Sequence, residues 1–156
     1  DPEARRDYFG GVAAKQSIVC ALMRGPEAHY ELAAEISKRM YAPVIEAHRA
    51  TVDQMAILEP VLSETICATC LTVIRKATDE AVRRGVPKQV AHDFILGHLN
   101  VELAILFDQM PGVRMSDAAN RAVERAKKEI FVPDWKKVFE PAAIEESIRM
   151  ITQVES

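Results

Sequence analysis

The sequence predicts an all-α fold, a multi-helix bundle formed by a single domain of 156 residues. Apolar residues recur at spacings of three and four along most of the chain, as they do on one face of a helix. Only six glycines occur, and neither alternating strand patterns nor hairpin dipeptides interrupt the periodicity. Prolines and glycines instead fall between the periodic segments, where helices begin and end.

The breaks between periodic segments divide the chain into successive helices. An N-cap, a first-turn proline and an acidic residue at positions 1–3 begin the first helix, and Gly25 ends it. Pro60 is expected either to kink the helix that contains it or to divide it from the next. The helices are expected at residues 1–24, 26–41, 44–60, 62–85, 87–110 and 116–131, with Pro133 and Pro141 punctuating the final segment.

The helix expected at residues 87–110 is apolar on most of its sides. Such a helix lies in the middle of a bundle or across a subunit interface. In so short a chain a partner subunit would supply part of its cover, so we expect a homodimer.

Composition excludes several classes of protein. The formal net charge is −3, with no basic cluster, which argues against nucleic acid as a partner. We find no apolar stretch approaching the roughly 18 residues of a membrane span and no signal peptide, so no membrane association is expected. Three cysteines do not make a disulfide framework, which is typical of a reducing compartment and predicts a cytoplasmic protein. Because the chain starts at Asp1 and not at methionine, we expect it to be part of a longer protein.

Polar residues interrupt the apolar helix at residues 87–110. Asp93, Gly97 and Asn100 follow the spacing i, i+4, i+7 and share one face, with His92 at its edge. His92 and Asn100 could form a wall that faces a substrate, or they could be core residues bonded to neighbouring carbonyls. His98 points elsewhere, so the two histidines are not expected to bind one metal ion together.

The first expected helix contains a glycine pair and a lysine on an apolar stripe. Gly10 and Gly11 each cost about 1 kcal/mol relative to alanine inside a helix, and they open space for a substrate or for another helix. Lys15 follows one turn after Gly11. Its ammonium either transfers a proton to a substrate oxygen or extends out to water, and spacing alone leaves both open.

Two further motifs favour structural roles. Glu64 lies near apolar positions and is expected in an ion pair, although a general base or a metal ligand remain alternatives. Cys67 and Cys70 form a C-x-x-C pair in the middle of a helix and not at its N-terminus, so buried structural cysteines are expected.

The stretches Gly10–Gln16 and Ala91–Asn100, together with the order of helices, resemble the C-terminal helical domain of 6-phosphogluconate-dehydrogenase-like oxidoreductases, in their D-apionate-oxidoisomerase-like branch. The resemblance covers nearly the whole chain. It implies a preceding Rossmann domain that binds NAD or NADP and is absent from this chain, where no strand precedes a G-x-G-x-x-G motif. It also favours Lys15 as the catalytic lysine, although Val19 stands where the usual motif has asparagine. Gly11, His92 and Asn100 are implied as substrate-cleft residues.

The resulting hypothesis is a substrate-binding and dimerisation domain of an NAD(P)-dependent oxidoreductase that acts on a hydroxy acid or sugar acid. One alternative is a non-catalytic helical dimerisation module. Another is a sugar-acid oxidoisomerase that needs a divalent metal ion, with Glu64 and a histidine among the ligands.

Overall fold

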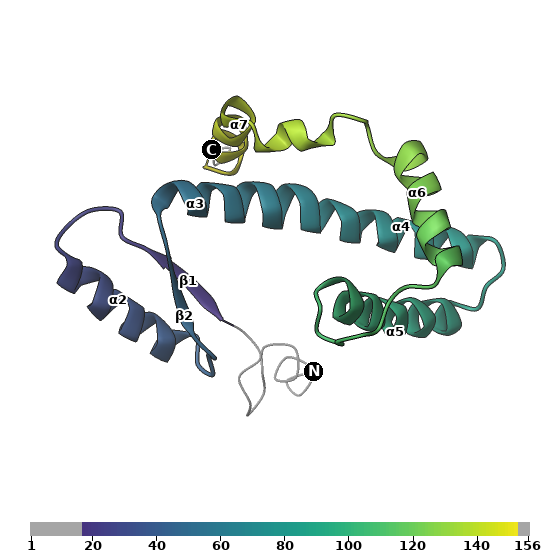
Figure 1. Ribbon diagram of the computed structural model, residues 1–156, viewed down its shortest axis with the longest axis horizontal. Coiled ribbons are helices and arrows are strands. Elements are labelled where there is room, and N and C mark those ends of the chain that lie inside the picture. The colour runs from purple at the N-terminus through teal and green to yellow at the C-terminus, as the bar shows by residue number, and fades with distance from the viewer. Residues whose placement is uncertain (1–16, 153–156) are drawn as a thin grey trace. The chain divides into compact units, whose positions relative to one another are not determined.

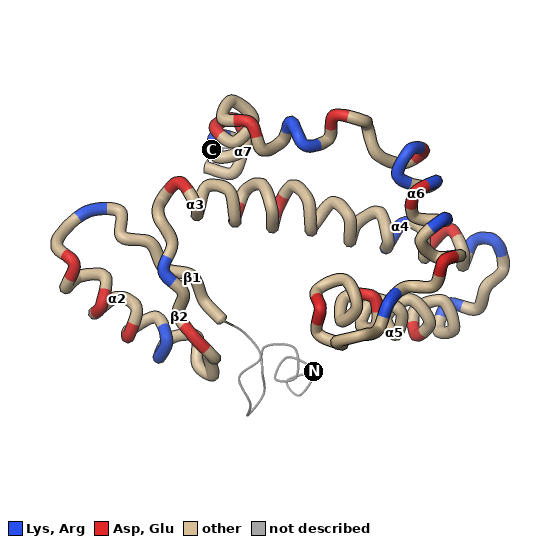
Figure 2. The backbone as a smooth tube through the Cα atoms, in the orientation of Figure 1, with Lys and Arg blue, Asp and Glu red and all other residues tan. Residues whose placement is uncertain are grey.

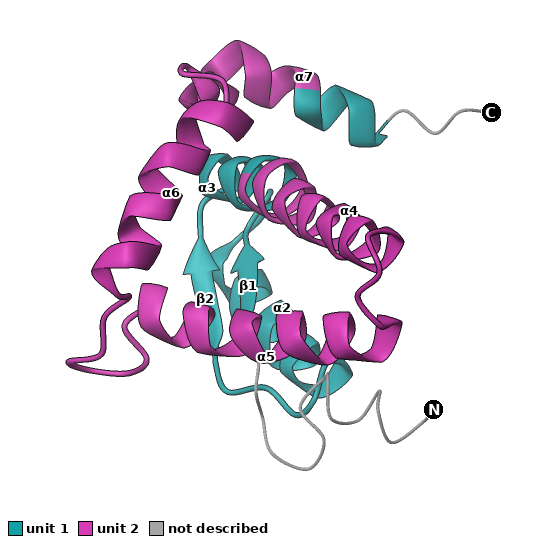
Figure 3. Cartoon of the chain, turned by 90° about the vertical axis from the view of Figure 1, so that its right-hand side faces the viewer, with its two compact units in different colours: residues 1–61, 147–156 teal, residues 62–146 magenta. Residues whose placement is uncertain are grey.

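The computed structural model describes residues 17–152, which are mostly helical and contain one small pair of parallel strands (Figure 1). They divide into two compact units, residues 1–61 with 147–156 and residues 62–146, and each unit is described by itself (Figure 3). The predicted helical fold class is confirmed. The strand pair was not predicted.

The first unit begins with a β-α-β arrangement. Strand β1 (Ile18–Ala21) leads into helix α2 (Glu27–Met40), and strand β2 (Ala47–Ala50) then pairs with β1 in parallel. The prediction that the first helix runs to about Arg24 is therefore wrong over β1, and the prediction of a helix from Val44 is wrong over β2. In both places four residues pair with a strand distant in the sequence, which overrides local helical periodicity.

A continuous helix follows from Val52 to Arg83. It starts as α3 (Val52–Ile57) behind a reciprocal capping box between Thr51 and Gln54, and it ends as α4 (Thr69–Arg83). Between them the π-helical segment η1 (Leu58–Ala68) contains Pro60. Proline has no N–H to donate and crowds the carbonyl four residues earlier, and the wider π turn accommodates both effects. Two alternatives were expected for Pro60, and the one in which it divides two helices is wrong.

The Val52–Arg83 helix is apolar for most of its length, with few charged residues before Arg75 (Figure 2). It has 32 residues, and its most apolar window has a mean hydropathy of 1.6 with 11% of that window buried. By length and composition it could cross a membrane, so the statement that no stretch approaches a membrane span is wrong.

The second unit also contains α5 (Lys88–Leu106), which packs against α4, and α6 (Asp117–Ile130). The hydroxyl of Ser116 accepts a bond from the Ala119 N–H at 3.2 Å, which confirms the predicted start of α6. The 3₁₀ segment η2 (Trp135–Phe139) and helix α7 (Pro141–Thr152), which is divided between the units, complete the described chain.

Buried side chains are few among the described residues. The buried apolar residues are Ala34, Pro60, Val61 and Ala91, and Val61 is 0% exposed. Large apolar side chains such as Leu62, Phe94 and Leu106 remain exposed on the long helix and on α5. Within residues 17–152 a large apolar surface therefore remains uncovered.

Candidate functional site around His92

The candidate site lies in the second unit, where α4 and α5 pack against each other. Arg84 and Gly85 end α4, with Gly85 at a φ of +103° that favours glycine, and Pro87 caps α5. Thr78 on α4 and Ala91 on α5 are each 8% exposed. The Thr78 hydroxyl donates to the Ile74 carbonyl at 2.9 Å, so this buried polar group is satisfied within its own helix.

A cavity of about 220 Å³ opens between these two helices beside His92. Its walls are mainly aliphatic, and they are formed by Leu71, Ile74, Arg75, Thr78, His92, Ile95, Leu96 and Leu99. The Nε2 atom of His92 is buried and has no hydrogen-bond partner among the described residues. A buried polar atom without a partner costs about 1–3 kcal/mol, which makes His92 the described residue best placed to bind a polar group of a ligand.

Arg75 brings a second polar group to the same cavity. Its Nε atom donates to both carboxylate oxygens of Asp79, at 3.1 and 3.2 Å, and this pair is exposed. An imidazole and a guanidinium beside an aliphatic wall suit a small molecule that carries hydroxyl or carboxylate groups. Sequence reasoning missed Arg75, because its proximity to His92 depends on how α4 and α5 pack.

The other predicted residues of α5 do not meet His92 in this cavity. Asn100 is exposed and does not line it. A Cβ atom added at Gly97 would meet nothing within 4 Å, so close packing among the described residues does not require glycine there. Asn100 as a substrate-binding residue stays a prediction.

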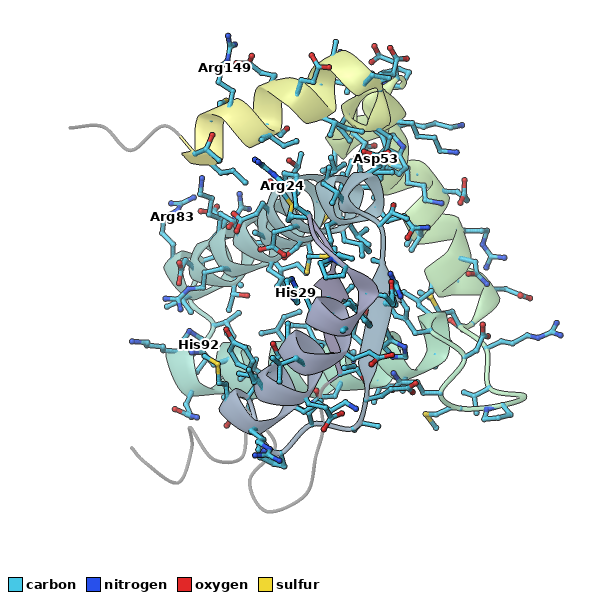
Figure 4. The ribbon with its side chains drawn as sticks, turned by 90° about the vertical axis from the view of Figure 1, so that its left-hand side faces the viewer. Arg24, His29, Asp53, Arg83, His92 and Arg149 are labelled. Carbon is cyan, nitrogen blue, oxygen red and sulfur yellow. The ribbon has the colours of Figure 1, made fainter. Side chains whose placement is uncertain are left out.

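The two histidines of α5 lie in different surroundings. The Nδ1 atom of His98 lies 2.9 Å from the Phe94 carbonyl, and the two rings are 4.0 Å apart. His98 is exposed and bonded within its own helix. The Nε2 atom of His92, which is labelled in Figure 4, is instead buried and has no partner among the described residues. The expectation that they do not share a face is consistent with this difference.

Lys15 and Gly11, the predicted catalytic residue and its neighbour, lie outside the described residues. Lys15 precedes β1 by three positions in the sequence. The helix expected to carry it does not extend through residues 18–21, so the apolar helical stripe expected beside Lys15 is not formed there. Its catalytic role therefore depends on the family resemblance and stays a prediction.

The two structural motifs differ from expectation. Cys67 is exposed and Cys70 is half-buried, and both are free, so the prediction of buried cysteines is wrong for Cys67. Glu64 is also exposed. It forms no ion pair with a described residue, so the expected ion pair is not found within residues 17–152. Within residues 17–152 no group of three or more potential metal-ligating side chains comes together.

The β1–α2 connection joins a strand to a helix, which is the usual frame of a dinucleotide site. Its residues 22–26 contain one glycine in place of the glycine-rich fingerprint. Glu27 occupies the first turn of α2, where a phosphate would otherwise bind, and its carboxylate accepts two hydrogen bonds from Arg49. These residues do not fit a dinucleotide.

Glu27, Arg49 and Tyr30 form one cluster, since the Arg49 guanidinium also lies 4.3 Å from the centre of the Tyr30 ring on α2. The hydrogen bond from Arg49 holds the pKa of Glu27 below its usual value. The cluster joins α2 to β2, and it is structural.

The described residues thus combine an uncovered apolar surface with a mainly aliphatic cavity that His92 and Arg75 line. Comparison with known proteins identifies the family. Residues 1–152 match the family described as phosphogluconate dehydrogenase (decarboxylating) C-terminal domain, and the chain belongs to this family.

Among similar proteins, a D-apionate oxidoisomerase of Cupriavidus necator is 59% identical over 97% of this chain and 55% of its own length. Another from Rhizobium rhizogenes is 54% identical, with the same coverage. The chain thus spans about half the length of the curated relatives it matches.

Two crystal structures have similar folds. A semialdehyde dehydrogenase NAD-binding protein from Cupriavidus necator, in complex with calcium and NAD, superimposes with a TM-score of 0.87 at 58% identity, covering 97% of this chain and 55% of that one. An oxidoreductase from Jannaschia has a TM-score of 0.81 at 45% identity, covering 98% of this chain and 54% of that one.

Proposed function

We propose that the chain is the substrate-binding and dimerisation part of an NAD(P)-dependent oxidoreductase that acts on a sugar acid such as D-apionate. The observation that carries this proposal is the 59% identity with a D-apionate oxidoisomerase over 97% of the chain. The cavity at His92 supports it, because Nε2 is available to bond a hydroxyl or carboxylate oxygen of such a substrate.

Oxidation of a hydroxyl to a carbonyl needs a hydride acceptor and a group that removes the hydroxyl proton. The nicotinamide supplies the first, and it would be held by the part of the protein that this chain does not cover. Lys15 is proposed to hold and move the proton at the substrate oxygen. His92, Asn100 and Gly11 are proposed to orient the substrate and bring it close to the backbone.

Replacement of Lys15 by methionine in the full-length enzyme tests this proposal. With D-apionate and NAD, and separately NADP, kcat should fall by about 100-fold or more, because general acid–base catalysis contributes on that order, while cofactor affinity should change little. Lys76→Met, on the exposed surface of α4, is the matched control and should retain activity. Undiminished turnover of Lys15→Met would remove the proposed role of the lysine.

A metal-dependent oxidoisomerase is the second candidate, and the calcium in the similar Cupriavidus necator structure favours testing it. Glu64 is exposed and free to act as one ligand beside a histidine, and because residues 17–152 contain no group of three potential ligands, the further ligands would come from outside them. Activity that disappears in EDTA and returns with a divalent cation would support this reaction. Full activity in EDTA would exclude it.

The dimer is proposed because the Val52–Arg83 helix and α5 leave apolar side chains uncovered. Lipid is a poorer cover than protein, because Glu59 and Glu64 interrupt the apolar part of the helix and a charged side chain such as aspartate costs about 2.5–3.5 kcal/mol at a bilayer centre. A sedimentation measurement at micromolar concentration should give a dimer, and Leu62→Glu should weaken it. A monomer at that concentration would contradict the proposal.

The remaining properties follow from composition. Free cysteines at positions 20, 67 and 70 suit the reducing cytoplasm. Acidic and basic residues alternate along α6 (Figure 2), and this mixed charge supports a small-molecule substrate and no nucleic acid partner.

A further inference from the structure

The β-α-β arrangement of the first unit is too small to be a complete sheet. Each strand has four residues, and two strands form the whole sheet among the described residues. Parallel sheets occur almost only as larger sheets covered on both faces, and an isolated pair of short strands is marginal in water. The pair therefore needs further strands from elsewhere.

The ladder shows which backbone groups are available for another strand. Ile18 N–H donates to the Glu46 carbonyl at 2.9 Å, and the register pairs Ile18 with Ala47 and Cys20 with Arg49. Successive residues of a strand point their backbone groups to opposite sides. Ile18 and Cys20 therefore bond towards β2, while Val19 and Ala21 point their N–H groups away from it.

The same alternation applies to β2. His48 and Ala50 direct their backbone groups towards β1, and Ala47 and Arg49 direct theirs to the outer side. Each strand thus has one edge that is not used by the pair.

The two strands differ in composition. β1 is the continuous apolar run Ile-Val-Cys-Ala, which is typical of a strand in the interior of a parallel sheet. β2 is Ala-His-Arg-Ala, and charged side chains are typical of an edge strand. Moreover, the Arg49 side chain is already committed to Glu27 and Tyr30 of α2, which lies beside the strands (Figures 1 and 3).

We propose that the outer edge of β1 pairs with a strand from the part of the protein that the relatives have and this chain does not cover, so that β2 forms the edge of the completed sheet. The chain spans only 55% of each of two similar oxidoisomerases, and the remainder of such a protein is long enough to supply the strand. The shared sheet would join this chain and the uncovered part into one folding unit. The two parts would then not be connected through helices alone. The proposal does not depend on which substrate or cofactor the enzyme uses.

Residue-resolved hydrogen exchange tests the proposal in the 156-residue chain and in the full-length protein. The amides of Val19 and Ala21 should exchange about 100-fold or more slowly in the full-length protein than in the chain, because a ladder bond protects them. The amides of Ala47 and Arg49 should remain fast in both. The readout is independent of catalytic activity, so it separates this proposal from the proposed function.

Three outcomes would overturn the proposal. Equal exchange of Val19 and Ala21 in both proteins would show that no strand is added. Slowing at Ala47 and Arg49 in their place would put the new strand beside β2. Slow exchange of Val19 in the chain alone, dependent on its concentration, would identify a second copy as the occupant.

A pair of proline variants provides a second test. Val19→Pro removes an outward N–H of β1, and Ala47→Pro removes the equivalent N–H of β2, and neither removes a bond between the two strands. In the full-length protein, Val19→Pro should lower Tm by about 4 °C or more beyond Ala47→Pro. Equal decreases, or a larger decrease for Ala47→Pro, would contradict an interior position for β1.

Discussion

Replacement of His92 by leucine separates a ligand-binding histidine from a structural one. His92 Nε2 is buried without a partner among the described residues, in a cavity lined by leucine and isoleucine side chains. A histidine retained for stability would be hydrogen-bonded, and its loss would destabilise the fold. A histidine retained for a ligand leaves an unsatisfied atom in the unliganded protein, so an apolar replacement should stabilise it.

The expected change in the free energy of unfolding follows from the unsatisfied Nε2 atom of His92. Relief of a buried unsatisfied group recovers about 1–3 kcal/mol, and imperfect packing of leucine against Leu71 and Ile95 offsets part of it. The free energy of unfolding should therefore rise by about 1–2 kcal/mol. For a chain of this length that increase corresponds to a Tm higher by about 2–8 °C.

Thermal and urea unfolding of the 156-residue chain measure this change, and steady-state kinetics of the full-length His92→Leu enzyme should show a raised KM for the sugar acid. His98→Leu is the matched control on the same helix. It removes an exposed contact with the Phe94 carbonyl, so it should be neutral or destabilising by up to about 1 kcal/mol. A lower Tm for His92→Leu than for His98→Leu would refute the reasoning.

Two further predictions concern the first unit. Gly25→Ala should cost about 1–3 kcal/mol of unfolding free energy in urea titrations, because Gly25 has a φ of +108°, and His29→Ala should not rescue it although the new Cβ would lie 2.8 Å from His29 Nδ1. Acid should weaken the α2–β2 connection: the Arg49 hydrogen bond lowers the pKa of Glu27 in the folded state, so its stabilisation is complete above the ordinary value of 4.5 and is lost as pH falls through the lower folded value. The Tm difference between the wild type and Glu27→Gln should shrink below that pH and in high salt, and a difference that grows on acidification would contradict the assignment.

Helices with local start and stop signals could be predicted from the sequence. Ser116 caps α6, and Gly85 with Pro87 separates α4 from α5, because capping and turn chemistry act over a few residues. The effect of Pro60 was harder to predict from the sequence, because it depends on whether the helix widens or breaks. The long helix around it widens into η1 and continues.

The strands could not be predicted in this way. Ile18–Ala21 is a run of four apolar residues, too short to distinguish a strand from a helix by periodicity. Ala47–Ala50 has no alternation or β-branched residue at all. Both become strands through a pairing 29 positions apart in the register of Ile18 with Ala47, which no local window contains.

The same difference between local and long-range determinants applies to the candidate site. His92 could be singled out from the sequence as a candidate, because a histidine on an apolar helix is unusual whatever surrounds it. Arg75 could not, because it reaches the cavity only through the packing of α4 on α5, where its side chain also forms an exposed ion pair with Asp79. Spacing along one helix therefore grouped Asn100 with His92, although Asn100 does not line the cavity, and it overlooked Arg75. A site formed between helices is determined by their contact, and residues of the same helix predict only one of its walls.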